Sequence, residues 1–111
     1  MKLDKVYLLN ILDAIKRIDK YLKGVSLSVF LKNTEKQDAV IRNIEIIGEA
    51  ANSLSKAFQT KHKDIPWRNI VDMRNKLIHD YDSVDYGIVW DVYSSKLPLL
   101  KKQLSALLKV L

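Results

Sequence analysis

Apolar residues recur every three or four positions along nearly the whole chain, and this spacing is the strongest constraint on its fold. It is the period of a helix with one buried face. No run alternates apolar and polar residues as a half-buried strand does, and no Asn-Gly or Asp-Gly pair marks a hairpin. The sequence therefore predicts an all-α protein, an antiparallel up-and-down bundle of four principal helices with a short extra helical turn.

The first helix is predicted from Asp4 to about Lys23, because its apolar stripe ends there and Gly24 is a favourable C-terminal stop. The segment 25–31 that follows is short and apolar. We expect it to form one turn of helix, with Phe30 as its anchor under the core.

The second long helix can be capped by Asn33 or Thr34, and its apolar period continues to about Gln59. Gly48 interrupts this period. A glycine inside a helix lowers stability unless something requires it, and the usual requirement is the close approach of another helix. We therefore expect a helix to pack against the small residues at 48–51.

The third principal helix is predicted within residues 66–81, with Pro66 in its first turn and Asp64 as its N-cap. Residues 82–85 have the composition of a loop and cap. The helical period then continues to the C-terminus, and Pro98 is expected to kink or break that last helix at about residue 96 or 97.

The chain as a whole has the size and composition of one globular domain, residues 1–111. It has no cysteine and only two histidines, His62 and His79, so a metal site is not expected. The N-terminus lacks the apolar core of a signal peptide, and no apolar run is long enough to span a bilayer. These features predict a cytoplasmic protein without a membrane segment. The net charge of +6 is compatible with RNA or with an acidic protein as partner.

Large aromatic residues are more numerous than one small core requires. Trp67, Tyr86, Trp90 and Tyr93, together with the small residues at 48–51, provide this surplus of packing surface. Aromatic residues at helical spacing usually belong to the core, yet a bundle of this size buries little surface by itself. The surplus therefore favours a homodimer.

The stretch 66–81 carries the densest set of chemically capable side chains. Ile70, Met73 and Leu77 form its predicted buried stripe. A polar stripe at the same spacing contains Arg68, Asp72, Asn75 and His79. Such a stripe is usually only a solvated face, but solvated faces are usually rich in Lys and Glu, whereas Arg, Asn and His bind phosphates and transfer protons.

No nucleophile elbow and no glycine-rich phosphate loop is present. A hydrolase with paired carboxylates, Asp72 and Asp80, is conceivable, although nothing places them about a sugar. The remaining set is His79 as general acid or base, Arg74 as a cation for a phosphate and Asn75 as an orienting amide. This set suits cleavage of RNA by the ribose 2′-hydroxyl, a reaction that needs neither a metal nor a cofactor. Candidate RNA-binding residues on the same stretch are Arg68 and Lys76.

The spacing of Arg74 and His79 raises a geometric question, because five residues on an ideal helix turn the side chains apart by roughly 140°. Either the helix ends before His79, or a second chain completes the site. In a two-fold dimer, two copies of each residue would meet in one cleft. The simpler alternative is that His79 caps the C-terminal end of its helix.

The run Arg-Asn-Lys-Leu-Ile-His-Asp-Tyr at residues 74–81 resembles the Arg-x4-His-x-Tyr motif of HepT-like toxins in the HEPN superfamily. Similar features occur in the expected order along the chain: Ile-Ile-Gly-Glu-Ala-Ala at 46–51, Ile-Pro-Trp at 65–67, Val-Trp at 89–90 and Leu-Pro-Leu-Leu at 97–100. Arg-x4-His alone is a weak signal, whereas this ordered combination is much more specific.

The resemblance implies a HEPN bundle that forms a homodimer, with the Arg–His motifs facing each other across a cleft. It implies a metal-independent endoribonuclease that acts as the toxin of a type VII toxin–antitoxin system, with Arg74 and His79 catalytic and Asn75 supporting. The partner implied is a minimal nucleotidyltransferase antitoxin (MntA-type), which attaches AMP to Tyr81. The alternative function is a non-catalytic HEPN subunit that binds and assists such a nucleotidyltransferase.

Overall fold

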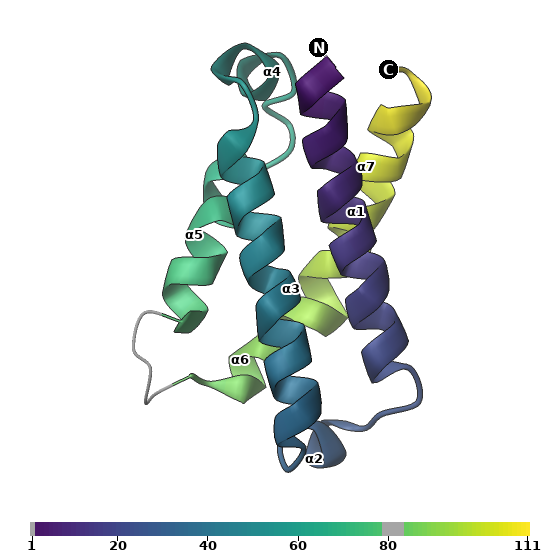
Figure 1. Ribbon diagram of the computed structural model, residues 1–111, viewed down its shortest axis with the longest axis vertical. Helices are drawn as coiled ribbons and strands as arrows, with labels where there is room; N and C mark the ends of the chain where they lie inside the picture. The colour runs from purple at the N-terminus through teal and green to yellow at the C-terminus, as the bar shows by residue number, and fades with distance from the viewer. Residues whose placement is uncertain (1, 79–83) are drawn as a thin grey trace.

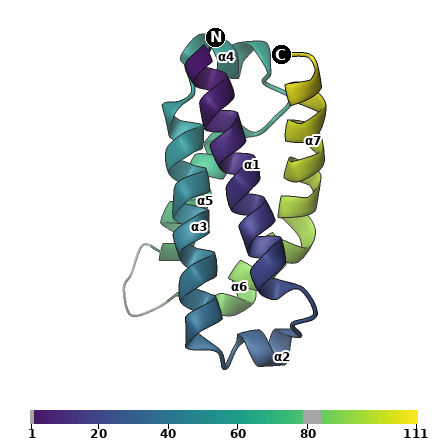
Figure 2. The same ribbon diagram turned by 45° about the vertical axis from the view of Figure 1, so that its right-hand side comes forward.

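The computed structural model describes residues 2–78 and 84–111, and within these ranges the chain is a bundle of helices without strands. Four long rods run alternately up and down: α1 (Lys2–Leu22), α3 (Thr34–Ser53), α5 (Trp67–Ile78) and the continuous series α6 (Tyr86–Asp91), η1 (Val92–Lys96) and α7 (Leu97–Lys109). Both chain ends lie at one end of the bundle, and the short helix α2 (Leu27–Phe30) closes the other (Figures 1 and 2). The predicted fold class is confirmed.

Helix α1 ends where the sequence predicts. Gly24 adopts a φ of +73°, the left-handed conformation that glycine accepts without strain, and the chain turns there. Ser26 then caps α2 by accepting a hydrogen bond from the Val29 backbone N–H. Phe30 is fully buried, as expected of an anchor.

Helix α3 begins after Asn33, whose side-chain oxygen accepts a hydrogen bond from the Lys36 backbone N–H at 3.0 Å. The predicted extent to Gln59 is wrong, because the helix ends at Ser53. Leu54 leaves the helical conformation with ψ of 142°, and a separate helix, α4 (Lys56–Lys61), follows. The apolar period continues across the break because Leu54 and Phe58 are both buried, which conceals it in the sequence.

The start of α4 is held by two side chains. Ser55 caps it through Oγ, which accepts a hydrogen bond from the Phe58 backbone N–H. The buried carboxylate of Asp4 on α1 accepts hydrogen bonds from both the backbone N–H and the hydroxyl of Ser55, each at 2.8 Å. A residue of a distant helix therefore binds the chain next to the point where the helical pattern is interrupted.

Helix α5 begins one residue later than predicted. The carbonyl of Pro66 accepts the first helical hydrogen bond, from the Ile70 N–H, so Pro66 stands just before the helix. The predicted N-cap at Asp64 is wrong, because among the described residues its carboxylate accepts no backbone hydrogen bond. The start is fixed instead by Trp67, which is buried and donates through Nε1 to the His62 carbonyl at 3.0 Å.

The final rod contains the irregularity expected near Pro98. Asp85 caps α6 by accepting hydrogen bonds from the N–H groups of Gly87 and Ile88. Residues 92–96 then form a turn of π-helix, in which the Leu97 N–H reaches back to the Val92 carbonyl. Because Pro98 has no N–H to donate, the regular pattern cannot pass through it, and the wider turn takes up the mismatch.

The aromatic residues pack within the chain. Phe30 lies between Tyr86 and Trp90, with ring centroids at 6.1 and 5.5 Å, and Trp90 packs against Tyr93 at 5.2 Å. The surplus surface on which the sequence argument for a dimer rested is therefore largely used inside one chain. No helix within the described residues is both long enough and apolar enough to cross a membrane.

Candidate active site

Helix α5 has the two faces that the sequence predicts. Ile70 and Leu77 are buried and Met73 is half-buried against the core. Arg68 lies on the opposite face, with its side chain 92% exposed and its Nε 3.8 Å from an Asp72 carboxylate oxygen. An ion pair this long and this exposed contributes little to stability, so Arg68 remains available to a ligand.

Arg74 is seated on α3 at Gly48. A Cβ atom added to Gly48 would lie 3.3 Å from Cβ of Arg74, 3.9 Å from its Cδ and 3.7 Å from the Val71 carbonyl oxygen. The two helices therefore touch at this point, and the stem of the arginine lies across the space that glycine leaves open. The predicted close approach of another helix at Gly48 is confirmed.

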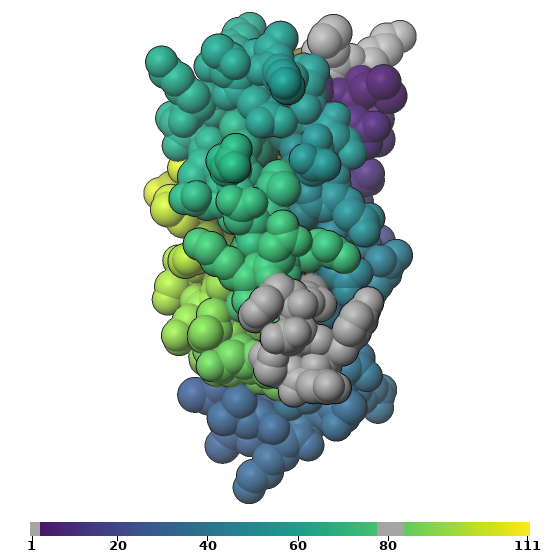
Figure 3. Space-filling model, turned by 90° about the vertical axis from the view of Figure 1, so that its left-hand side faces the viewer, coloured from purple at the N-terminus to yellow at the C-terminus, as the bar shows by residue number. Residues whose placement is uncertain are grey.

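The charged end of Arg74 reaches solvent although its stem is packed. The residue is exposed as a whole, and Nη1 donates to the side-chain oxygen of Asn75 at 3.5 Å, the outer limit of a hydrogen bond. Asn75 is also exposed. These two predicted site residues, which are neighbours in the chain, are thus both accessible on α5. Helices α3 and α5 lie side by side on this face of the molecule (Figure 3).

Two of the predicted functional residues, His79 and Tyr81, lie outside the described residues, as does Asp80. In the sequence, His79 follows directly after Ile78, the last residue of α5. The remaining predicted site residue, Lys76, is exposed and projects from α5.

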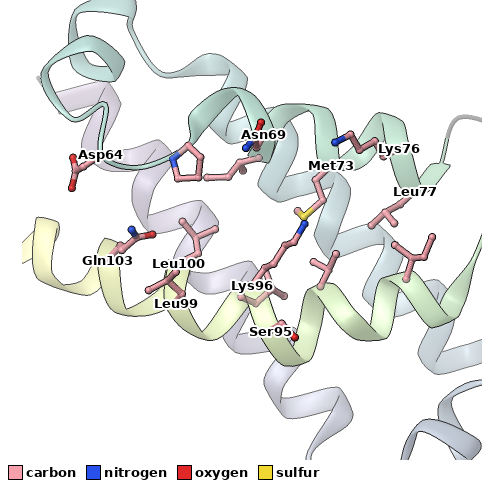
Figure 4. Close-up of a pocket in the computed structure, with 15 residues that line it drawn as sticks. Asp64, Asn69, Met73, Lys76, Leu77, Ser95, Lys96, Leu99, Leu100 and Gln103 are labelled. Carbon is pink, nitrogen blue, oxygen red and sulfur yellow. The ribbon is translucent and has the colours of Figure 1, made fainter.

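A groove of about 500 Å³ runs along the other flank of α5, between it and the rod formed by α6, η1 and α7 (Figure 4). Its lining is mainly apolar, with Met73 and Leu100 on facing walls. Lys76 and Lys96 also line the groove, and the Lys96 side chain extends across it toward Met73 (Figure 4). Arg74 does not line it, because the arginine stem faces α3. The groove and the arginine site are therefore separate features.

The other histidine of the chain, His62, contacts aromatic residues of α4 and α5. The His62 ring packs against Phe58 at a centroid distance of 4.5 Å, and the His62 carbonyl accepts the Trp67 hydrogen bond. These contacts join α4 to the start of α5. Within residues 2–78 and 84–111, no three His, Asp or Glu side chains are close enough to hold a metal ion.

Sequence reasoning identified Arg74 and Asn75 but did not connect Gly48 to them. The signal was the glycine inside a helical pattern, which predicted a close helix without indicating which one. Only the packed structure shows that the side chain in contact with Gly48 is that of Arg74, the arginine of the motif.

Comparison with known proteins agrees with this architecture. Residues 11–107 match the ribonuclease HepT-like family. The chain is 39% identical over 109 residues to "Putative RNase TTE0752" of Caldanaerobacter subterraneus subsp. tengcongensis, covering 98% of this chain and 97% of that protein. It is 39% identical over 105 residues to "Probable ribonuclease HepT" of Thermococcus cleftensis, covering 95% and 96%. No solved structure matched the chain significantly.

The all-helical bundle is consistent with a HEPN-type protein, and the match to the family model shows that the chain is of this type. The chain belongs to the ribonuclease HepT-like family, which places it by descent among the ribonucleases.

Proposed function

We propose that this protein is the toxin component of a type VII toxin–antitoxin system, a metal-independent endoribonuclease neutralised by attachment of AMP to Tyr81. The observation that carries the proposal is the placement of Arg74. Its stem is packed on α3 while its guanidinium is exposed beside Asn75, five residues before His79. A cation held in this way can bind a phosphate from solution.

The proposed reaction uses the RNA's own 2′-hydroxyl as nucleophile. One imidazole removes the hydroxyl proton while the oxygen attacks the adjacent phosphorus, and the P–O5′ bond breaks. The leaving 5′-oxygen receives a proton from an acid, and the products are a 2′,3′-cyclic phosphate and a 5′-hydroxyl. Arg74 stabilises the negative charge that accumulates on the phosphoryl oxygens, and Asn75 orients the guanidinium.

The base and the acid can come from two copies of His79. On a single ideal helix, Arg74 and His79 point roughly 140° apart. A homodimer with the two motifs facing each other supplies both residues in one cleft, together with Arg68 and Lys76 as further cations for the RNA backbone.

The inhibitory partner in this proposal is a minimal nucleotidyltransferase. AMP on Tyr81 would add a phosphate within two residues of His79. A phosphate paired with Arg74 occupies the position of the RNA phosphate, so the modification blocks the site by competition and without unfolding the bundle.

Cleavage of single-stranded RNA in the presence of EDTA tests the activity. We expect Arg74→Ala and His79→Ala each to lose a factor of roughly 10²–10⁴ in rate, the usual contribution of a general acid or base. Arg17→Ala, which removes an exposed arginine from α1, is the matched control and should cleave at the wild-type rate.

Expression in a bacterial host gives the second measurement. Wild-type protein should arrest growth, and His79→Ala should not. Cleavage at the wild-type rate by either site variant would refute the catalytic assignment. A wild-type protein that binds a nucleotidyltransferase but cuts no RNA would establish the alternative, a non-catalytic HEPN subunit.

A further inference from the structure

Helices α3 and α5 contact each other at Gly48 of α3 and Arg74 of α5. Gly48 is buried inside α3, where any residue other than proline would favour the helix more. Arg74 is exposed, although its Cβ and Cδ lie within 3.3 and 3.9 Å of the position that a Cβ on residue 48 would take. The two residues therefore share one small space, and the arginine stem occupies it.

This seat is one contact that holds the Arg74 side chain. Another is the hydrogen bond to Asn75, which at 3.5 Å is long and solvent-exposed. A long arginine side chain with no packed stem would sample many rotamers, and the planar guanidinium would then not be aimed at a fixed point. The absence of a side chain at residue 48 is what lets the stem lie flat on α3.

A Cβ on residue 48 would be closer than ordinary van der Waals contact to one neighbour, the Cβ of Arg74 at 3.3 Å. The added Cβ would also lie 3.7 Å from the Val71 carbonyl oxygen, which is part of the α5 backbone. A methyl group is therefore confined between the arginine stem and that backbone. Because the Arg74 Cβ is bonded to the α5 backbone, it can give way only if α5 shifts by a few tenths of an ångström at this point, and that shift carries the arginine stem with it.

We propose that Gly48 is a positioning residue for the ribonuclease reaction: it aims the guanidinium of Arg74 by giving its stem a flat seat on α3. This inference rests on the proposed function for its catalytic consequence, but the seating itself does not depend on it. Gly48 touches neither RNA nor the reacting atoms and acts only through Arg74.

The first test compares Gly48→Ala with wild type in steady-state RNA cleavage. Displacement by 1 Å can lower a rate by about 10²-fold, and a shift of a few tenths of an ångström should cost less, so we expect kcat to fall roughly tenfold with little change in KM. Gly48→Val, which is larger, should lose more. Ser53→Ala, an exposed substitution on the same helix, is the control and should leave both constants unchanged.

A double-mutant cycle separates positioning from a general loosening of the bundle. In an Arg74→Ala background, adding Gly48→Ala should change the rate by less than twofold, because no guanidinium remains to be misaimed. A further tenfold loss in that background would overturn the proposal, since it would show that Gly48 acts through something other than Arg74.

The second test observes Arg74 directly and needs no activity. The side-chain Nε–Hε resonance of Arg74, assigned by its loss in Arg74→Ala, should shift in Gly48→Ala and stay unchanged in Ser53→Ala. An unchanged resonance in Gly48→Ala would overturn the seating. If Arg74→Ala itself cuts RNA at the wild-type rate, the proposed function fails, while the resonance still decides whether Gly48 positions the side chain.

Discussion

The carboxylate of Asp4 holds the backbone N–H and the hydroxyl of Ser55 at 2.8 Å each, although the two residues are 51 positions apart. This contact ties the first turn of α1 to the N-cap of α4. Asp4 is only 3% exposed, so its carboxyl oxygens accept hydrogen bonds from Ser55 and not from bulk water.

Loss of this contact should destabilise the fold. We expect Asp4→Ala to lower the free energy of unfolding by about 1–3 kcal/mol, because it leaves the Ser55 groups without their acceptor. Thermal or urea unfolding followed by circular dichroism measures the change. Asp13→Ala, which removes an exposed carboxylate from the same helix, is the control and should have little effect. Equal stability of the Asp4→Ala variant and wild type would contradict this account.

Arg68 and Lys76 should contribute to RNA binding through the phosphate backbone. Both are exposed on α5, and neither is held in a short ion pair among the described residues. Each alanine substitution should weaken binding to unrelated RNA sequences by a similar factor. Each should also reduce the slope of log K against log salt by roughly 0.7, the contribution of one phosphate contact on a single strand. Lys16→Ala on α1 serves as the control, and an unchanged slope in Lys76→Ala would exclude that residue from the interface.

The proposed shared cleft requires a dimer. Because one helix cannot direct Arg74 and His79 to the same point without a break, we expect the active species to contain two chains. Sedimentation or light scattering at micromolar concentration should give twice the mass of the chain. A mixed dimer of Arg74→Ala with His79→Ala keeps one Arg74 and one His79 in the shared cleft, so it should be more active than either single-variant homodimer but less active than wild type. A monomer that cleaves RNA at the full rate would refute the shared cleft.

Tyr81 should be the site of modification. Incubation with the cognate nucleotidyltransferase, ATP and Mg²⁺ should add an adenylyl group to the wild-type protein and abolish cleavage. Tyr81→Phe should gain no mass by intact-protein mass spectrometry and should remain active. Tyr86→Phe is the matched control. Because Tyr86 is half-buried against Phe30, the Tyr86→Phe variant should be modified like wild type.

Modification of the Tyr81→Phe variant would show that the modified residue is another one, with Tyr86 as the next candidate. Modified wild type that still cuts RNA would show that the modification is not the off-switch.

The helices themselves result from interactions between residues that are close in the sequence, and these interactions can be recognised from the sequence alone. The apolar period of α1, the left-handed Gly24 and the side-chain caps at Asn33 and Asp85 act over a few residues, so each can be recognised without the fold. The same holds for Pro98. Its missing N–H interrupts the hydrogen-bond pattern of its own helix, whatever that helix packs against. For these reasons the all-α class and the helix ends that depend on local signals are predictable from the chain alone.

Other features depend on residues that are distant in the sequence, and only the packed bundle decides them. One example is the contact of Asp4 on α1 with Ser55, which lies next to the break at Leu54 and 51 positions further along the chain. The candidate site also depends on residues that are distant in the sequence. The chain carries Arg74 and Asn75 as neighbours, but the seat that holds the arginine is Gly48, 26 positions earlier, and the two meet only because α3 and α5 pack face to face. Periodicity determines which face of a helix is buried, whereas the partner that covers it depends on how all the helices fill the core together.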